Sequence, residues 1–198
     1  MNKKIIGLLA LLTFSSGGFA GESAGTYSVS PFLGWTYYDE VQHLWSGPVE
    51  GVRLGYDLVG HFGVEAMFSW AQILDSNVNY GIEPASAINY RLDFLYNFFP
   101  CGIVDPFLAA GPGGTRLYSN YRGVVNQEIF SARTYDDFTV NAGGGLKWYL
   151  SRRFVMRGEV RQLWLFNDKG SDNPVLHNWE YTVGLSLQFG GKNCRNGT

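Results

Sequence analysis

Large apolar residues alternate with small or polar residues along most of the chain, and this period of two constrains the fold more than any other feature. In the first such segment the even positions mostly hold Thr, Ser or Gly, and the odd positions hold Tyr27, Val29, Pro31, Leu33, Trp35 and Tyr37. Successive side chains of a β-strand point to opposite faces, so the pattern predicts a strand with one apolar face. Seven further segments follow it, although Gly and Ala leave the two faces of residues 106–118 hard to distinguish.

The connections between these eight predicted strands alternate between long and short. The short ones are Val59–His61, Pro100–Asp105 and Ser151–Arg153. The long ones are Asp39–Pro48, Asp75–Ser86, Ser119–Asp136 and Asn167–His177. All short connections therefore lie at one rim of an antiparallel sheet and all long ones at the other. Short turns opposite long loops, with strands of about ten residues that rise about 25 Å, are typical of transmembrane barrels. We predict an all-β, closed, up-and-down antiparallel eight-stranded transmembrane β-barrel.

Charged residues occupy the face opposite the apolar rows. We expect them to form an ionic network in the lumen, with the members Arg53, Glu65, Arg91, Asp93, Arg157, Glu159 and Arg161. Solvation at a rim is the alternative, chiefly for three charges nearer the strand ends, Asp57, Lys147 and Glu180. A soluble barrel with an apolar interior would expose no such aromatic rows, because large exposed apolar patches are rare on soluble monomers. Eight strands enclose just enough space for side chains, so these charges would plug the lumen.

Composition agrees with a chain that meets lipid. Only 16% of the 198 residues are charged, against roughly 25% in a typical soluble domain, and another 16% are aromatic. The formal net charge of −2 provides no cationic surplus for nucleic acid. No stretch beyond the first twenty residues reaches 18 apolar residues, so helices are not expected to hold the chain in a membrane.

The first twenty residues have the pattern of a secretory signal peptide. Lys3 and Lys4 precede an apolar run over Ile5–Phe14, and Gly18–Ala20 provides a small-residue cleavage site. The apolar run is about half the length that a transmembrane helix needs. We expect a cleaved signal peptide over residues 1–20, the barrel over 21–190 and a short periplasmic tail over 191–198.

Several short motifs resemble the OmpA-like outer-membrane β-barrel family over roughly residues 25–190. They are Gly51–Tyr56, Tyr90–Asp93 with its Tyr96–Phe98 end, Pro106–Gly111 and Asn178–Gly184. The resemblance implies an eight-stranded barrel in a Gram-negative outer membrane, often with a structural or surface-exposed role. Two features depart from the family. Only nine residues follow Phe189, so the peptidoglycan-binding domain of longer members is not expected, and the strand that carries this aromatic residue does not end the chain.

Candidate catalytic and metal-binding residues are few. His43, His61 and His177 lie far apart in the sequence, and no Cys or carboxylate cluster has metal-ligand spacing, so we expect neither a metal site nor a cofactor. A lipid-modifying enzyme would need a His with a Ser nucleophile, for which no evident pair exists. We therefore predict no enzyme. Gly111–Gly114 and Gly143–Gly145 lack the Lys-Ser/Thr ending of a phosphate loop, which favours close packing of strands.

The two cysteines fall at the same predicted rim. Cys101 lies in a short turn and Cys194 lies in the tail, both on the periplasmic side of the proposed topology. The periplasm is oxidising, so a disulfide between them is possible. Two free thiols are the alternative.

The resulting functional prediction is an integral outer-membrane barrel with a structural or surface-interaction role and a plugged lumen. A loop-mediated adhesin or ligand-binding protein and a narrow pore are the alternatives, because binding residues concentrate on loops. The expected partners are outer-membrane lipid and lipopolysaccharide, the periplasmic chaperones and barrel-assembly machinery during insertion, and an unknown extracellular ligand, with no nucleic acid.

Overall fold

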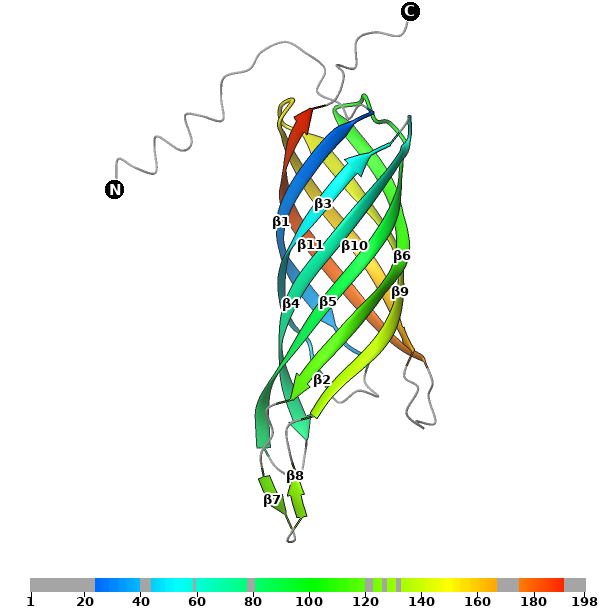
Figure 1. Ribbon diagram of the computed structural model, residues 1–198. Coiled ribbons are helices and arrows are strands. Elements are labelled where there is room, and N and C mark those ends of the chain that lie inside the picture. Colours follow the sequence, from blue (N-terminus) through cyan, green and yellow to red (C-terminus); the bar gives the residue numbers. More distant parts are fainter. Residues whose placement is uncertain are drawn as a thin grey trace, which may run out of the picture.

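The computed structural model describes residues 24–39, 44–58, 60–77, 81–119, 123–125, 128–130, 133–166 and 175–190. Eight long antiparallel strands make up most of these residues. The long strands are β1 (Thr26–Tyr37), β3 (Gly47–Asp57), β4 (Phe62–Asn77), β5 (Gly81–Asn97), β6 (Val104–Ser119), β9 (Arg133–Tyr149), β10 (Phe154–Phe166) and β11 (Val175–Gly190). Each pairs with the next, and β1 pairs with β11, which closes the sheet into the barrel of Figure 1. The predicted closed up-and-down barrel is confirmed.

The register of the strands determines their tilt. Starting at Glu50 on β3, the cross-strand pairs can be followed around the barrel in two directions. One direction, through β4 and β5, reaches Arg116 on β6. The other direction, through β1, β11, β10 and β9, reaches Pro106 on the same strand. The two paths therefore reach β6 ten residues apart, which is the shear of the barrel. With about 3.3 Å per residue along a strand and about 4.8 Å between strands, this shear corresponds to a tilt of about 40°.

Several strands extend further toward the long-loop rim than the sequence predicted. β4 and β5 remain paired as far as Asn77 and Gly81, and β6 and β9 remain paired as far as Ser119 and Arg133. Apolar alternation marks only the part of a strand that has an apolar face, whereas the backbone ladder continues without it. The predicted loops 75–86 and 119–136 are therefore largely strand where the structure describes them.

Three short strands accompany these extensions at the long-loop end. β2 (Leu44–Trp45) pairs with β4, and β7 (Gly123–Val125) pairs with β8 (Glu128–Phe130) in a separate two-stranded sheet. Figure 1 shows β7 and β8 projecting beyond the end of the barrel. The short turns between the long strands all lie at the opposite end.

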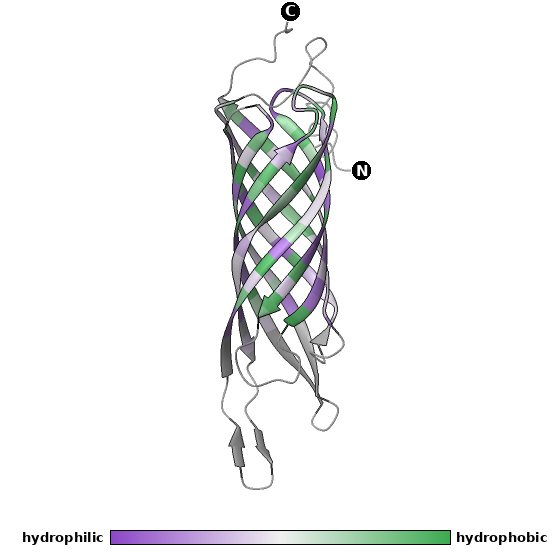
Figure 2. Ribbon diagram, turned by 90° about the vertical axis from the view of Figure 1, so that its right-hand side faces the viewer, coloured by the Kyte–Doolittle hydropathy of each residue, from purple (hydrophilic) through white to green (hydrophobic). Residues whose placement is uncertain are grey.

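The two faces of the sheet differ as the alternation predicted. Phe94 and Trp148 are 63% and 50% exposed on the outside, whereas Arg91 and Glu159 are buried inside the barrel. Hydrophobic and hydrophilic residues alternate along the strands in Figure 2. Exposed aromatic rings gather near both ends of the outer face, with the contacting pairs Tyr27–Tyr56, Phe62–Tyr96, Tyr96–Phe98, Tyr37–Tyr181 and Phe138–Phe166. Such girdles are a feature of outer-membrane barrels.

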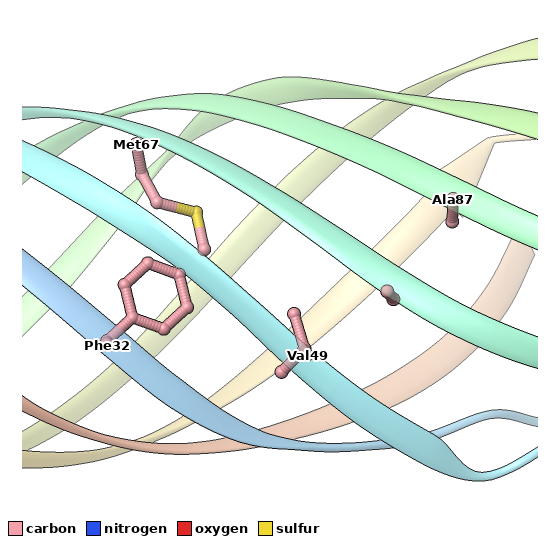
Figure 3. Packing of buried hydrophobic residues seen from close by; sticks show 5 residues of the cluster. Phe32, Val49, Met67 and Ala87 are labelled. Carbon is pink, nitrogen blue, oxygen red and sulfur yellow. The ribbon is translucent and has the colours of Figure 1, made fainter.

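A small apolar cluster lies inside the barrel, on β1, β3, β4 and β5. Its buried members are Phe32, Val49, Met67, Ala71 and Ala87, and Figure 3 shows the first three side chains packed together. Phe32 occupies one of the even positions of the first strand, most of which hold small or polar residues. The cluster therefore fills one part of the interior, and further buried apolar clusters there are formed by Leu95, Phe107 and Ala109 and by Tyr149 and Val155.

Candidate functional site

The seven charged residues that the sequence singled out all lie inside the barrel, and none is more than 5% exposed. β3 provides Arg53, β4 provides Glu65, β5 provides Arg91 and Asp93, and β10 provides Arg157, Glu159 and Arg161. The three residues on β10 are two positions apart, so the strand period places them on one face. We call these seven residues, together with Glu180 described below, the ionic lattice.

Glu159 lies at the centre of the ionic lattice. Its carboxylate accepts hydrogen bonds from Arg53 Nη2 at 2.6 Å, from Arg157 Nη2 at 2.7 Å and from Arg161 Nε at 3.1 Å. Thr182 adds a weaker contact to Glu159 Oε1 and accepts a hydrogen bond from Arg53 Nη2 at 2.7 Å. One carboxylate therefore serves three guanidinium groups.

Two arginines of β10 reach across the interior to other strands. Arg157 Nη1 lies 2.5 Å from Glu65 Oε2 on β4, and Arg161 Nη1 lies 2.5 Å from Asp93 Oδ2 on β5. Asn141 of β9 joins the second pair, because its amide donates to Asp93 and accepts from Arg161. In the closed order of strands, β4 stands four places from β10 and is therefore on the opposite wall.

A further ion pair spans the barrel and includes Glu180, whose partner the sequence did not reveal. Arg91 Nη2 of β5 lies 2.7 Å from Glu180 Oε1 of β11, again on opposite walls. Glu180 is only 1% exposed, and Lys147 is also buried, whereas Asp57 is partly exposed. Solvation at a rim, the alternative for these residues, therefore does not apply to Glu180 or Lys147. Glu180 is the cross-strand neighbour of Arg161, so the strand register would have predicted its place.

Two aromatic rings also contact the ionic lattice from within the barrel. The Arg53 guanidinium lies 3.8 Å from the centre of the Phe32 ring, and that of Arg157 lies 4.3 Å from the Phe107 ring. A guanidinium over an aromatic face is attracted to the ring electrons, more strongly where water is excluded. The two rings therefore support the arginines on faces that carry no carboxylate.

Glycines of β6 and β9 provide the space that the ionic lattice occupies. A Cβ at Gly111 or Gly113 would lie 2.8 Å from Asp93 Oδ1 or Arg91 Cγ. A Cβ at Gly143 or Gly145 would also lie 2.8 Å from its nearest lattice side chain, which belongs to Arg161 or Glu159. The nearest atom to each of these added Cβ atoms is a backbone carbonyl oxygen of the neighbouring strand. The close packing predicted for the glycine runs is therefore packing against the adjacent strand as well as against the charged side chains.

The ionic lattice is electrically balanced. Four arginines, at positions 53, 91, 157 and 161, face four carboxylates, at positions 65, 93, 159 and 180. Desolvating charges is costly, and an ion pair offsets this cost only when its geometry is good and its remaining hydrogen-bonding groups are satisfied. The short contacts of Glu159 and Glu65 meet the geometric part of that condition, whereas Arg53 Nε, Arg91 Nε and Nη1, Arg161 Nη2 and Glu180 Oε2 are buried without a hydrogen-bond partner. The arrangement can hold the barrel walls together and fill the interior.

Other candidate groups are distributed over the ends of the barrel. His61 Nδ1 lies 2.7 Å from the carbonyl oxygen of Asn97, and His177 Nδ1 lies 3.4 Å from Gln162 Nε2, whereas His43 lies outside the described residues. Among the residues that the structure describes, no group of three His, Cys, Asp or Glu side chains could hold a metal ion. In the same residues, no helix is long and apolar enough to cross a membrane.

Cys101 is bonded in a disulfide at the turn between β5 and β6. Cys194, the other cysteine of the chain, lies outside the described residues, as do the predicted signal peptide 1–20 and tail 191–198. The pairing of the two cysteines and these boundaries therefore stay predictions.

Comparison with solved structures supports the fold. The N-terminal β-barrel domain of OprF from Pseudomonas aeruginosa is 18% identical, with a TM-score of 0.56 and coverage of 85% of this chain and 100% of that chain. The outer membrane protein OprG from the same organism is 12% identical, with a TM-score of 0.61 and coverage of 86% and 99%. Ail of Yersinia pestis, the attachment invasion locus protein, is 13% identical, with a TM-score of 0.52 and coverage of 84% and 99%.

Sequence comparison identifies the family. Curated proteins yield no match to this chain. The family described as the outer membrane protein beta-barrel domain matches residues 6–189, which is most of the chain. Its description agrees with the closed antiparallel sheet of the structure. The chain belongs to the outer membrane β-barrel domain family.

Proposed function

We propose that this chain is an integral outer-membrane barrel whose lumen is plugged by the ionic lattice and whose role is structural or surface-interacting. The observation that carries the proposal is that two ion pairs connect opposite walls of the barrel. They are Arg157 with Glu65 and Arg91 with Glu180. Side chains that meet across the diameter of a barrel leave little cross-section for solutes. The proposal includes no catalytic step.

One small cavity lies beside the ionic lattice. A cavity at the short-turn end, lined among others by Ser28, Asp57, Lys147 and Gln188, has a volume of about 10 Å³. This volume suits about one water molecule and no larger solute. Opening a passage would require the charged side chains to separate, and each separation would leave a buried charge without its partner.

The proposed orientation follows the family and the loop lengths. The short-turn rim, with the start of β1, the end of β11 and Cys101, faces the periplasm after export by the signal peptide. The long-loop rim faces outward, where lipopolysaccharide surrounds the barrel. Periplasmic chaperones and the barrel-assembly machinery are the partners during insertion, because the exposed apolar rows must be kept from aggregating before they reach lipid.

Conductance in a planar lipid bilayer tests the plugged lumen. We expect the folded wild-type protein to give no steady conductance above the bare bilayer. As a matched control, Asp136→Asn changes an exposed charge outside the lumen and should also give none. A large, steady conductance of the wild type would contradict the proposal. A heat-modifiable gel shift of the same sample verifies that the barrel is folded.

Binding through the long loops is the second candidate, and one structural observation favours it. At the long-loop end β4, β5, β6 and β9 continue past the last paired residues of β3 and β10, and the β7–β8 sheet projects further (Figure 1). Ail, which shares the fold, is described in complex with the heparin analogue sucrose octasulfate. The projecting wall of strands is a candidate place for an extracellular ligand to bind this chain.

Deletion of residues 121–132 tests this second candidate. The barrel strands should still assemble, because these residues lie beyond the paired ends of β6 and β9. We expect binding to heparin-coated beads to fall to background in the deletion variant if the loop binds sulfated sugars. Equal retention of the wild-type and deletion proteins would contradict a role for this loop.

A further inference from the structure

The disulfide of Cys101 constrains a part of the chain that lies beyond the last paired strand. Cys101 is exposed in the β5–β6 turn and is disulfide-bonded. The chain contains one other cysteine, Cys194, and only the three residues 191–193 separate it from Gly190 at the end of β11. Within one molecule, only Cys194 can be the partner, and the connection that leads to it is very short.

The two ends of this connection lie on opposite sides of the opening at the short-turn rim, which we call the mouth. Gly190 pairs with Thr26, the first residue of β1, so it lies at this rim, as the β5–β6 turn does (Figure 1). In the closed order of strands, β5 stands four places from β11 in either direction. Gly190 also has a φ of 76°, a left-handed conformation that takes the chain out of the extended direction of the strand. The connection therefore leaves one wall and ends at the other.

Covalent geometry leaves one route between these ends. Eight strands about 4.8 Å apart and tilted by about 40° enclose a barrel about 16 Å across. The four Cα steps from Gly190 to Cys194 span at most about 14 Å, and a disulfide adds about 5.5 Å between its two Cα atoms. This reach of about 19 Å suffices for a direct crossing of the mouth. The path around the rim, past β10 and β9 to the β5–β6 turn, is longer, at about 22 Å.

We infer that residues 191–194 form a strap that crosses the mouth from β11 to the β5–β6 turn and is held there by a disulfide between Cys101 and Cys194. The inference rests on the proposed periplasmic orientation and plugged lumen, and it adds a second barrier in series with the ionic lattice. Formation of the bond converts two thiols into a disulfide, releases two protons and passes two electrons to a protein disulfide, the class of oxidant that acts in the periplasm. Cys101 is exposed and therefore accessible to such an oxidant.

The strap lies over the small cavity at the short-turn end of the interior. That cavity is lined among others by Lys147 of β9 and Gln188 of β11. Gln188 is two residues before Gly190 and is only 7% exposed. A strap that runs from Gly190 to the opposite wall therefore passes above the cavity. While the disulfide is intact, the strap separates the cavity from solutes in the periplasm, and reduction of the disulfide releases it.

Shortening the strap tests its route. Deletion of Lys192 and Asn193 leaves a reach of about 12 Å, which is less than the width of the barrel. After refolding in vesicles with a glutathione redox buffer, we expect the disulfide-bonded fraction, measured by thiol counting, to fall at least about ten-fold. The control variant, Lys192→Gly with Asn193→Gly, keeps the length and should keep the bond, and the gel shift should show that both barrels are folded. Full bonding in the shortened variant, or a disulfide-linked dimer of the wild type on an unreduced gel, would overturn the inference.

Access to the mouth provides an independent readout. In nanodiscs with a water-soluble paramagnetic agent, we expect the side-chain amide signal of Gln188 to be broadened at least about two-fold more in Cys194→Ser than in the wild type, because the strap is released. The signal of Asn141, which lies within the ionic lattice, should not change. Equal broadening of Gln188 in the two proteins would contradict closure by the strap. A steady conductance of the wild type would overturn the plugged lumen alone, whereas a wild type without conductance and a shortened variant with its bond intact would overturn the strap alone.

Discussion

Neutralising the centre of the ionic lattice should have the largest effect of any single charge substitution in the barrel. Glu159→Gln keeps the shape of the side chain but removes the charge that Arg53, Arg157 and Arg161 share at 2.6, 2.7 and 3.1 Å. Four arginines then face three carboxylates. One end of the glutamine is also an NH₂ group, which cannot accept a hydrogen bond from a guanidinium.

The expected magnitude follows from burial. Removal of one partner from a buried ion pair costs about 3–5 kcal/mol, because the remaining charge stays out of water. Glu159 is only 5% exposed, so solvent offers little compensation. A loss of this size changes the unfolding equilibrium constant by roughly two to three and a half orders of magnitude. Exposed ion pairs contribute only about 0–1 kcal/mol, so the charge pair on the outer face provides a scale for comparison.

Urea unfolding in lipid vesicles, followed by tryptophan fluorescence and by the gel shift of the folded barrel, measures this loss. Asp136→Asn is the control, because it removes the partner of Arg116 in a pair whose side chains are 56% and 47% exposed. We expect the control to lie within about 1 kcal/mol of the wild type. If Glu159→Gln also lies within that range, the buried charges do not stabilise the barrel as described here.

Three further predictions concern packing and the cysteines. Gly143→Ala should prevent or strongly reduce assembly, because its Cβ would clash with the backbone carbonyl of Val160 and with the Arg161 side chain. Gly158→Ala should assemble normally, because no atom lies within 4 Å of the added Cβ, and the folded fraction on an unheated gel checks both variants. Phe107→Ala should lower the free energy of unfolding by about 3–5 kcal/mol, because a buried aromatic ring is lost. The measurement uses the same vesicles, and an unchanged free energy of unfolding would contradict the buried position of Phe107. Mass spectrometry of unreduced peptides should find Cys101 linked to Cys194, and Cys194→Ser should release one reactive thiol; a thiol count of two in the unreduced wild type would refute the linkage.

The alternation of side chains along the strands predicted most of the fold, because a lipid-facing surface and a polar interior require different side chains. Tyr27, Phe94 and Trp148 lie outside as predicted, since each belongs to an unbroken apolar row. The strand ends were less predictable, because pairing between β4 and β5 continues where the apolar row has ended. Backbone hydrogen bonds there leave no signature in side-chain hydropathy.

The candidate site was predictable in membership but not in connectivity. Charge and parity identified the interior position of Arg53 and Glu159, but their contact depends on how far around the barrel β3 and β10 lie from each other. The relative position of the two strands follows from the shear of the barrel. The shear can be calculated only when the register of every strand pair is known. The same reason explains why Glu180 had no evident partner in the sequence. Phe32 and Phe107 escaped notice because they are apolar residues on the polar face.

Quenching of tryptophan fluorescence tests most directly whether the aromatic face meets lipid and the charged face fills the interior. Trp35, Trp70, Trp148 and Trp179 are exposed on the outer face of the barrel. In vesicles whose lipid chains carry bromine, we predict strong quenching of the folded wild type, with little quenching by acrylamide in the water. Quenching by acrylamide and not by brominated lipid would contradict the arrangement of the two faces.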